Sequence, residues 1–132
     1  MTEPSLQDIR DLATVAARAA ADKKAEDTVI LEVGAVLAIT DAFVVTSGTN
    51  PRQVRTIAEE VERKVAEAAG RKPLRVEGLD DARWVLLDYG DFVVHVFLDD
   101  VRRFYDLERL WADAPRVAWH TEAVPRSAAS TP

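Results

Sequence analysis

Pairs of acidic side chains are the first candidates for chemistry in this sequence. A magnesium-dependent transfer of a nucleotide needs two carboxylates two residues apart on a strand, because both then point to one face and can hold the ion. Glu60 and Glu62 have this spacing, but they lie in a predicted helix, where they point in different directions. Asp88 and Asp91 lie three residues apart across a predicted turn. The metal-binding geometry is missing, so a nucleotidyltransferase-like enzyme or nucleotide-binding domain is kept only as the alternative function.

Two other arrangements of reactive groups find little support. Ser47 or Thr49 could be combined with His95 and Asp88 into a catalytic triad, but the nucleophile elbow with its flanking glycines is lacking. The segment 47–52, SGTNPR, has one glycine and no Gly-Lys-Ser/Thr, so it is not a P-loop. Exposed amides at a helix start can bind an anion, although a simple helix cap is the favoured interpretation. We predict no catalytic residues, no metal and no cofactor.

Four side chains on two adjacent predicted strands are better suited to binding a protein. Trp84 and Asp88 share one face of their strand, Tyr89 follows directly, and His95 lies among apolar residues of the next strand. Tryptophan, tyrosine and arginine dominate binding hot spots. If exposed, these residues would form an apolar centre with an acidic rim, suited to a basic protein. The alternative is that Trp84 and His95 are ordinary core residues, and the residue types alone leave both interpretations open.

The composition limits the class of protein. The 132 residues fall in the size range of one domain, and 48% hydrophobic with 30% charged residues is typical of a globular chain. No apolar run reaches the roughly 18 residues of a membrane helix, and the start lacks the basic and apolar regions of a secretory signal. The absence of cysteine excludes disulfides, thiolate metal sites and cysteine catalysis. We expect a cytoplasmic protein that does not contact a membrane.

The net charge of −6 bears on the kind of partner. A protein that binds nucleic acid unaided normally presents a basic face, because neutralising phosphates supplies most of the affinity. We therefore expect no direct binding of DNA or RNA. A basic protein partner fits the sign of the charge better, although an acidic surface is also ordinary for a bacterial protein.

The first half of the chain predicts two helices and two strands. Residues 5–24 carry apolar side chains at 3,4 spacing behind a serine cap, which indicates an amphipathic helix. Residues 28–33 and 43–47 are rich in β-branched and apolar residues, as strands are. The clearest helix covers residues 51–69, with an asparagine cap, a proline in its first turn and a glycine at its end.

The second half predicts a short strand, a hairpin and a last helix. The strand 74–77 follows a helical connection, which favours a parallel crossover. Residues 83–88 and 92–98 are two strands joined by a tight link, and a helix follows from residue 99 to about 112. The order αββαβββα predicts an α/β fold, with a mixed sheet of about five strands and flanking helices.

These elements make up one domain with two terminal extensions. We predict a flexible N-terminus over residues 1–4 and a single domain over 5–112. Residues 113–132 hold three prolines with serine, threonine and alanine and show little periodicity, so we predict a flexible C-terminal tail.

Five segments in register resemble the ribosomal silencing factor family, also called Iojap or RsfS. No single segment is decisive, but their common order and spacing over most of residues 5–112 is highly specific. The segments are AITD (38–41), SGTNPRQV (47–54), VEG (76–78), WVLLDYGDFVVHVF (84–97) and RRFYDLERLW (102–111).

The resemblance implies a translational repressor rather than an enzyme. A member of this family binds the large ribosomal subunit through its basic L-fourteen-type protein when nutrients fail, blocks joining of the small subunit and so slows protein synthesis. The fold is related to the nucleotidyltransferases, without catalysis or cofactor. By motif position, Trp84, Asp88 and His95 lie at or near the partner contact, and with them Tyr89, at a position that other apolar residues fill in relatives. A monomer and a homodimer both stay open.

Overall fold

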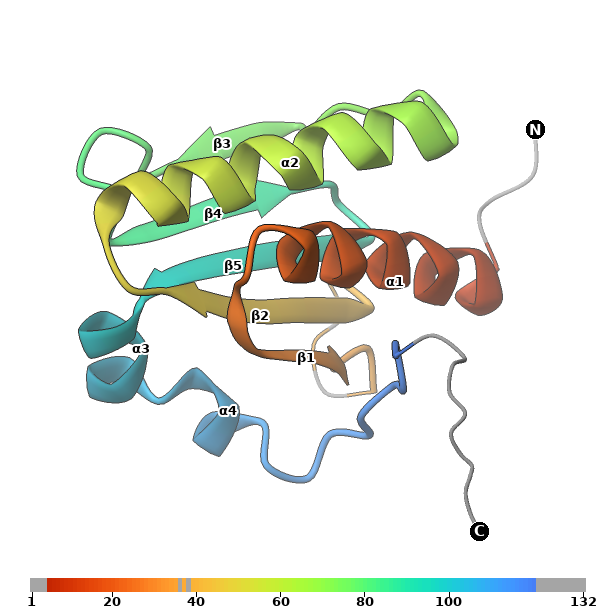
Figure 1. Ribbon diagram of the computed structural model, residues 1–132. Coiled ribbons are helices and arrows are strands. Elements are labelled where there is room, and N and C mark those ends of the chain that lie inside the picture. Colours follow the sequence, from red (N-terminus) through yellow and green to blue (C-terminus); the bar gives the residue numbers. More distant parts are fainter. Residues whose placement is uncertain (1–4, 36, 38, 121–132) are drawn as a thin grey trace, which may run out of the picture.

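The computed structural model describes residues 5–35, 37 and 39–120, so the segments 1–4 and 121–132, for which we predict flexibility, lie outside the described residues. The described chain is an α/β fold with one five-stranded sheet (Figure 1). Its elements are α1 (Leu6–Asp22), β1 (Glu26–Glu32), β2 (Ala42–Gly48), α2 (Pro51–Ala69), β3 (Arg75–Glu77), β4 (Trp84–Asp88), β5 (Phe92–Leu98), α3 (Asp99–Tyr105) and α4 (Leu107–Leu110). Within these residues, no helix has the length and apolar character needed to cross a membrane.

The sheet is mixed, as the sequence predicts. Its strand order is β1-β2-β5-β4-β3, with β2 parallel to β5 and the other neighbours antiparallel. Every residue of β2 is buried, because this strand lies inside the sheet and both of its faces are covered. β3 has the same direction as β2, but it lies at the far edge with β5 and β4 in between. The crossover through α2 therefore passes over β5 and β4 before the chain enters β3.

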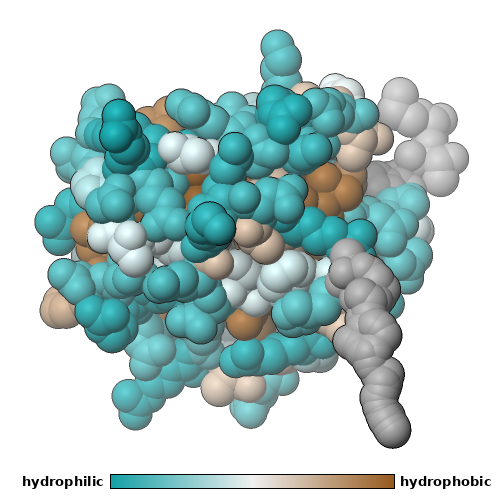
Figure 2. All heavy atoms as spheres, viewed as in Figure 1, coloured by the Kyte–Doolittle hydropathy of each residue, from teal (hydrophilic) through white to brown (hydrophobic). Residues whose placement is uncertain are grey.

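Both long helices cover one face of the sheet and begin where their caps predict (Figure 1). The Ser5 hydroxyl accepts the Asp8 amide, and the Asp8 carboxylate accepts the Ser5 amide, which is a complete capping box. Asn50 caps α2, and Gly70 ends that helix in the left-handed conformation. The alanine-rich stripe of α1 and the valine and isoleucine stripe of α2 form the main core against the sheet. The outer surface over these two helices is largely hydrophilic (Figure 2).

The single last helix that the sequence predicts is instead two short helices. Asp106 adopts a left-handed conformation with φ of 47°, which ends α3 and precedes α4. The buried Arg102 holds this corner in place, because its guanidinium donates to the Ser47 hydroxyl, the Glu108 carboxylate and the carbonyl oxygen of Asp27. Satisfying a buried guanidinium with this many acceptors takes precedence over continuing the helix.

Residues 113–120 do not form a free tail and correct our predicted domain boundary. The Glu32 amide donates to the Pro115 carbonyl at 2.8 Å, and the Val117 amide donates to the Ile30 carbonyl at 3.0 Å. The Trp119 indole donates to the Thr28 carbonyl at 2.9 Å. This segment therefore covers the open edge of β1, whose backbone groups would otherwise lack partners. Proline is tolerated in such an edge position, so the prolines did not exclude pairing.

Candidate functional site

The second face of the sheet has much less cover than the first. α3 contacts β2 and β5 at one end of the sheet, and residues after α4 pack near β1 and β2. Strand alternation directs Trp84, Leu86 and Asp88 of β4 to this face, opposite Phe97, His95 and Val93 of β5 respectively. Leu86 and Asp88 are only partly buried. We call the face of the sheet that carries these six side chains the open face, within which Val93, His95 and Phe97 of β5 are themselves buried.

Trp84 and His95 are joined by a hydrogen bond across β4 and β5. The Trp84 Nε1–H donates to His95 Nδ1 at 3.1 Å, so Nδ1 carries no proton and Nε2 carries one. His95 is 5% exposed, and among the described residues its Nε2 has no hydrogen-bond partner. Burial lowers the pKa of His95 to about 4, and the charge of Asp88 only partly opposes this. The imidazole is therefore neutral at physiological pH and presents one N–H donor.

Aromatic rings hold this pair in place. The His95 and Phe43 rings meet edge to face, with centroids 4.7 Å apart. Trp84 packs on Phe97 at 4.8 Å and on Tyr105 at 5.0 Å. Ring pairs at these separations have favourable quadrupole geometry in addition to buried area. From the sequence, Trp84 and His95 could be either core residues or binding residues. In the structure both side chains pack against other aromatic rings, and both also line surface hollows.

A hollow of about 330 Å³ lies over β4 and β5. Its walls are mainly apolar, with two charged side chains among them: Ile39, Thr40, Phe43, Leu74, Arg75, Leu86, Asp88, Gly90, Val93 and His95. Arg75 donates to the Asp88 carboxylate at 3.3 Å. The predicted acidic rim is therefore a mixed rim here, because an arginine from β3 lies beside the aspartate.

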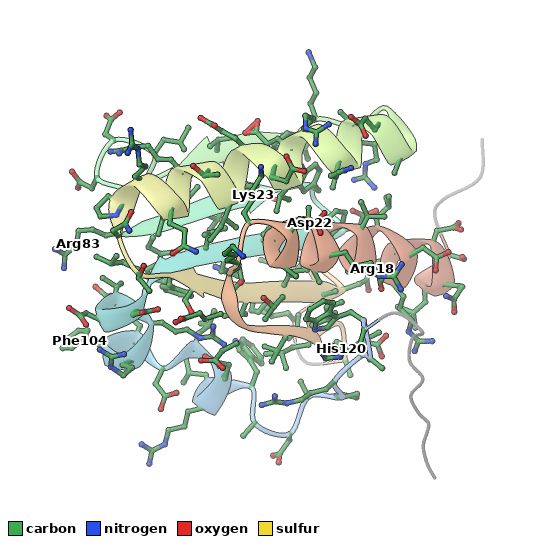
Figure 3. The ribbon with its side chains drawn as sticks, viewed as in Figure 1. Arg18, Asp22, Lys23, Arg83, Phe104 and His120 are labelled. Carbon is green, nitrogen blue, oxygen red and sulfur yellow. The ribbon has the colours of Figure 1, made fainter. Side chains whose placement is uncertain are left out.

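The open face continues past Trp84 onto α3. Arg83 and Phe104 project at the same end of the molecule (Figure 3) and line a shallow hollow together with Tyr105. Phe104 is 79% exposed. An exposed phenylalanine next to the Trp84–Tyr105 contact enlarges the apolar area that a protein partner could cover.

Tyr89 is not part of this surface. Its side chain is 2% exposed and stacks on Phe92, with ring centroids 4.6 Å apart, on the side of the sheet that α1 and α2 cover. Burial raises the pKa of Tyr89 to about 12, with a smaller contribution from the Glu62 carboxylate. Alternation could have shown this from the sequence, since Tyr89 directly follows Asp88 and so points to the opposite face. The sequence-based grouping of Tyr89 with Trp84 and His95 is therefore wrong as a surface.

The carboxylates near the hairpin have structural partners. Asp88 accepts the Gly90 amide at 2.8 Å, and Gly90 has φ of 91°, which a glycine adopts without strain. Asp91 forms a two-contact pair with Arg71, which also donates to the Tyr89 carbonyl at 2.7 Å. Among the residues that the structure describes, no group of three or more His, Asp or Glu side chains could hold a metal ion.

Of the residues that line the hollow, only Asp88 and His95 were predicted as site residues, and Ile39, Thr40 and Leu74 are among those that were missed. Ile39 and Thr40 belong to a segment that we matched only as a motif, and Leu74 precedes a short strand. Their positions depend on how the loop before β2 and the strand β3 fold against β4 and β5. The matched segment at 38–41 was the one available signal, because it had no other role in the predicted fold.

Comparison with known proteins places the chain in a family. The family model described as "Ribosomal silencing factor during starvation" (RsfS) matches residues 6–132. A ribosomal silencing factor RsfS of Halalkalibacterium halodurans is 46% identical over 82% of this chain and 92% of its own length. The RsfS of Bacillus subtilis is 42% identical over 80% of this chain and 89% of its own length.

Solved structures agree with this result. The crystal structure of a Chromobacterium violaceum protein superposes with a TM-score of 0.75 and 32% identity, and the match covers 91% of this chain and 96% of that one. A Bacillus halodurans crystal structure superposes with a TM-score of 0.70 and 43% identity, covering 83% and 98%. With the family model, the relatives and the shared fold in agreement, the chain belongs to the ribosomal silencing factor (RsfS) family.

Proposed function

We propose that this protein represses translation by binding the large ribosomal subunit through a basic, L-fourteen-type ribosomal protein and blocking its joining with the small subunit. Family membership supports a ribosomal role. A mouse relative, 30% identical over 67% of this chain and 40% of its own length, is named "Mitochondrial assembly of ribosomal large subunit protein 1". The observation that carries the proposal is the open face, where Phe104 and Tyr105 lie exposed beside the partly buried Trp84.

The contact is centred on Trp84, with Asp88 and His95 beside it. Trp84 offers a large ring whose indole N–H already donates a hydrogen bond to His95. A partner can therefore bury this ring without leaving a polar group unpaired. Tyr89 acts from the opposite side of the sheet, where its ring supports the hairpin that carries Asp88. It is a supporting residue in this proposal and not a surface contact.

The mechanism is steric exclusion. Two partners cannot occupy one face of the subunit, so a bound repressor keeps the small subunit away without making or breaking a bond. When the repressor is present at about 100 times its Kd, roughly 1% of large subunits stay free, which corresponds to about 2.7 kcal/mol. A contact of about 800 Å² on each partner is enough for a stable complex.

Charge supports the same kind of partner. The net charge of −6 attracts a basic protein over a distance and raises the association rate, an effect that salt weakens. At the contact itself, the Arg75–Asp88 pair has no strong net charge. We therefore assign specificity to the shape and hydrogen bonding of the open face, and steering to the charge of the whole molecule. We place this action in the cytoplasm, under nutrient limitation.

The test is binding and subunit joining with purified components. The protein should co-sediment with large subunits and reduce the light scattering produced when small subunits are added. Trp84→Ala should weaken binding by about 2 kcal/mol or more. The matched control is Trp119→Ala, which removes an equal ring at the β1 edge and should bind normally. Joining that proceeds at full rate with the protein saturating would refute the proposal.

A further inference from the structure

Two buried polar atoms of the hollow over β4 and β5 are left without partners. Within the described part of the chain, neither His95 Nε2 nor Thr40 Oγ1 has a hydrogen-bond partner, and both atoms have less than 1 Å² of exposed surface. Thr40 comes from the loop before β2 and His95 from β5, yet both side chains line the same hollow. Native folds leave few buried polar atoms unsatisfied, so two in one hollow need an explanation.

We propose that this hollow receives a loop of the protein partner, and that His95 Nε2–H donates a hydrogen bond to an uncharged oxygen which the loop presents. The oxygen belongs to a peptide carbonyl, a side-chain amide or a hydroxyl. Thr40 Oγ1 completes the site as acceptor or donor to the peptide group next to that oxygen. The inference rests on the proposed function, because it specifies how the open face recognises the ribosomal protein.

The charges around the hollow select an uncharged group. A carboxylate entering the hollow would approach the Asp88 carboxylate, whose neighbouring Arg75 is already shared with Glu77. A lysine or arginine head would bring more N–H donors to the N–H of His95, which offers no acceptor on that nitrogen. A neutral oxygen avoids both problems and gives the single donor a partner.

Trp84 is a positioning residue for this bond. The Trp84 Nε1–H donates to His95 Nδ1. The neutral His95 imidazole must therefore carry its proton on Nε2. Without the indole donor, the imidazole could carry its proton on either nitrogen, and the form with a bare Nε2 would offer an acceptor in place of a donor. Trp84 therefore contributes to recognition through His95 as well as through its own ring.

Because His95 Nε2 and Thr40 Oγ1 have almost no exposed surface, a partner oxygen reaches them only after neighbouring side chains move. Ile39 is 82% exposed and Leu74 is 74% exposed, and both line the hollow. Their exposed atoms are not locked by packing, so they can turn outward to admit a peptide group. Once in contact with the partner they become part of the buried interface, which recovers apolar area.

Substitutions that change one polar group at a time test this assignment. In His95→Asn, the amide oxygen can still accept from Trp84, but no group replaces Nε2–H. We expect its affinity for purified large ribosomal subunits to fall about tenfold, as for loss of one buried hydrogen bond. Thr40→Val has nearly the same shape without the hydroxyl, and we expect a several-fold loss of affinity together with equal or higher stability to denaturant.

Matched controls separate this effect from general damage. His120→Asn removes the other histidine, at the end of the described C-terminal segment. Thr56→Val removes a hydroxyl of α2 that already donates to the Arg52 carbonyl. Both controls should bind like the unmodified protein. If the unmodified protein binds and His95→Asn binds equally well, the inference is overturned while the proposed function stands. If the unmodified protein does not bind large subunits, both are overturned.

Nuclear magnetic resonance of the histidine ring nitrogens gives an independent readout. In the free, full-length protein, His95 should show a protonated Nε2 and an unprotonated Nδ1. On binding large subunits or the isolated ribosomal protein, the Nε2–H signal should shift and exchange more slowly with water. A proton found on Nδ1 in the free protein would overturn the inference, because the donor would then be absent from the hollow.

Discussion

The two faces of the sheet differ in how completely other elements cover them. Under α1 and α2, tightly packed alanine, valine and isoleucine side chains fill the space. The open face has only α3, α4 and the residues after them, and it keeps a hollow, exposed apolar groups and an aromatic row. Of the four buried polar atoms without partners in the described chain, His95 Nε2, Thr40 Oγ1 and Trp111 Nε1 belong to the open side and one, Tyr89 OH, to the helical side.

Together with the proposed function, that difference assigns stability mainly to the helical face and partner binding to the open face. A face that only has to hold the fold together can be filled completely. A face that has to bind a partner keeps uncovered apolar area and unsatisfied donors, and it loses some stability of the free protein as a result. Substitutions on the helical face should therefore change the free energy of unfolding, and those on the open face should mainly change binding.

The largest expected effect is truncation of the helical core. Ile57→Ala should lower the free energy of unfolding by about 3 kcal/mol, because a fully buried isoleucine of α2 is replaced by a cavity. Leu86→Ala, on the open face and only partly buried, should cost less than about 1 kcal/mol while weakening binding to large subunits. Urea denaturation measures both. Equal losses of stability would contradict the distinction between the faces.

The next effect is a pH dependence that comes from the open face. Because burial lowers the pKa of His95 to about 4, the unfolded chain binds more protons than the folded one between about pH 4 and 6.5. The stability contributed by this group is therefore complete above about pH 6.5 and falls by roughly 3 kcal/mol as the pH drops to 4.

Comparison with a variant isolates this histidine from the carboxylates that titrate in the same range. His95→Asn should have a flatter dependence of unfolding free energy on pH than the unmodified protein. Identical pH profiles for the two proteins would show that the His95 imidazole is not buried in its neutral form.

Two indole N–H groups give a smaller and more selective comparison. Trp84→Phe and Trp119→Phe each remove one hydrogen bond, to His95 Nδ1 and to the Thr28 carbonyl respectively. Each change is expected to amount to about 1 kcal/mol. We expect Trp119→Phe to lower the free energy of unfolding and leave binding intact, and Trp84→Phe to weaken binding. The reverse assignment of the two effects would place the functional surface at the β1 edge.

The smallest effect on stability is expected at exposed apolar residues. Phe104→Ser on α3 and Leu6→Ser on α1 should each change the free energy of unfolding by no more than about 0.5 kcal/mol. Only Phe104→Ser should weaken binding to large subunits, since Phe104 borders the open face. Sedimentation of the labelled variants with large subunits provides the measurement. Unchanged binding of Phe104→Ser would restrict the contact to β4, β5 and the hollow.

Local patterns in the sequence were enough for most of the fold. The caps of α1 and α2, the glycine that ends α2 and the hairpin of β4 and β5 were all predicted and are confirmed. Each depends on residues close together in the chain, whose preferences act before any tertiary contact. The predictions failed at the C-terminal end, where the break at Asp106 and the pairing of residues 113–120 depend on distant partners.

The surface that we propose as the partner contact was predicted only in part. Trp84, Asp88 and His95 do share a face, because alternation along two antiparallel strands is a local rule. Tyr89 was misplaced, since we grouped it by residue type rather than by its position in that alternation. Thr40, Ile39 and Leu74 were missed, because nothing near them in the chain indicates that they line a hollow with His95.

The amino-acid sequence by itself determined the order of the elements, the caps, the family and the side chains that point away from the helical core. These features follow from backbone preferences and from the period of apolar residues. Only the tertiary structure decided which face of the sheet stays uncovered and that the last segment covers the β1 edge. It also decided that Thr40 and His95 share a hollow without partners. These features depend on contacts between residues that are far apart in the chain. Local backbone and side-chain preferences do not determine such contacts.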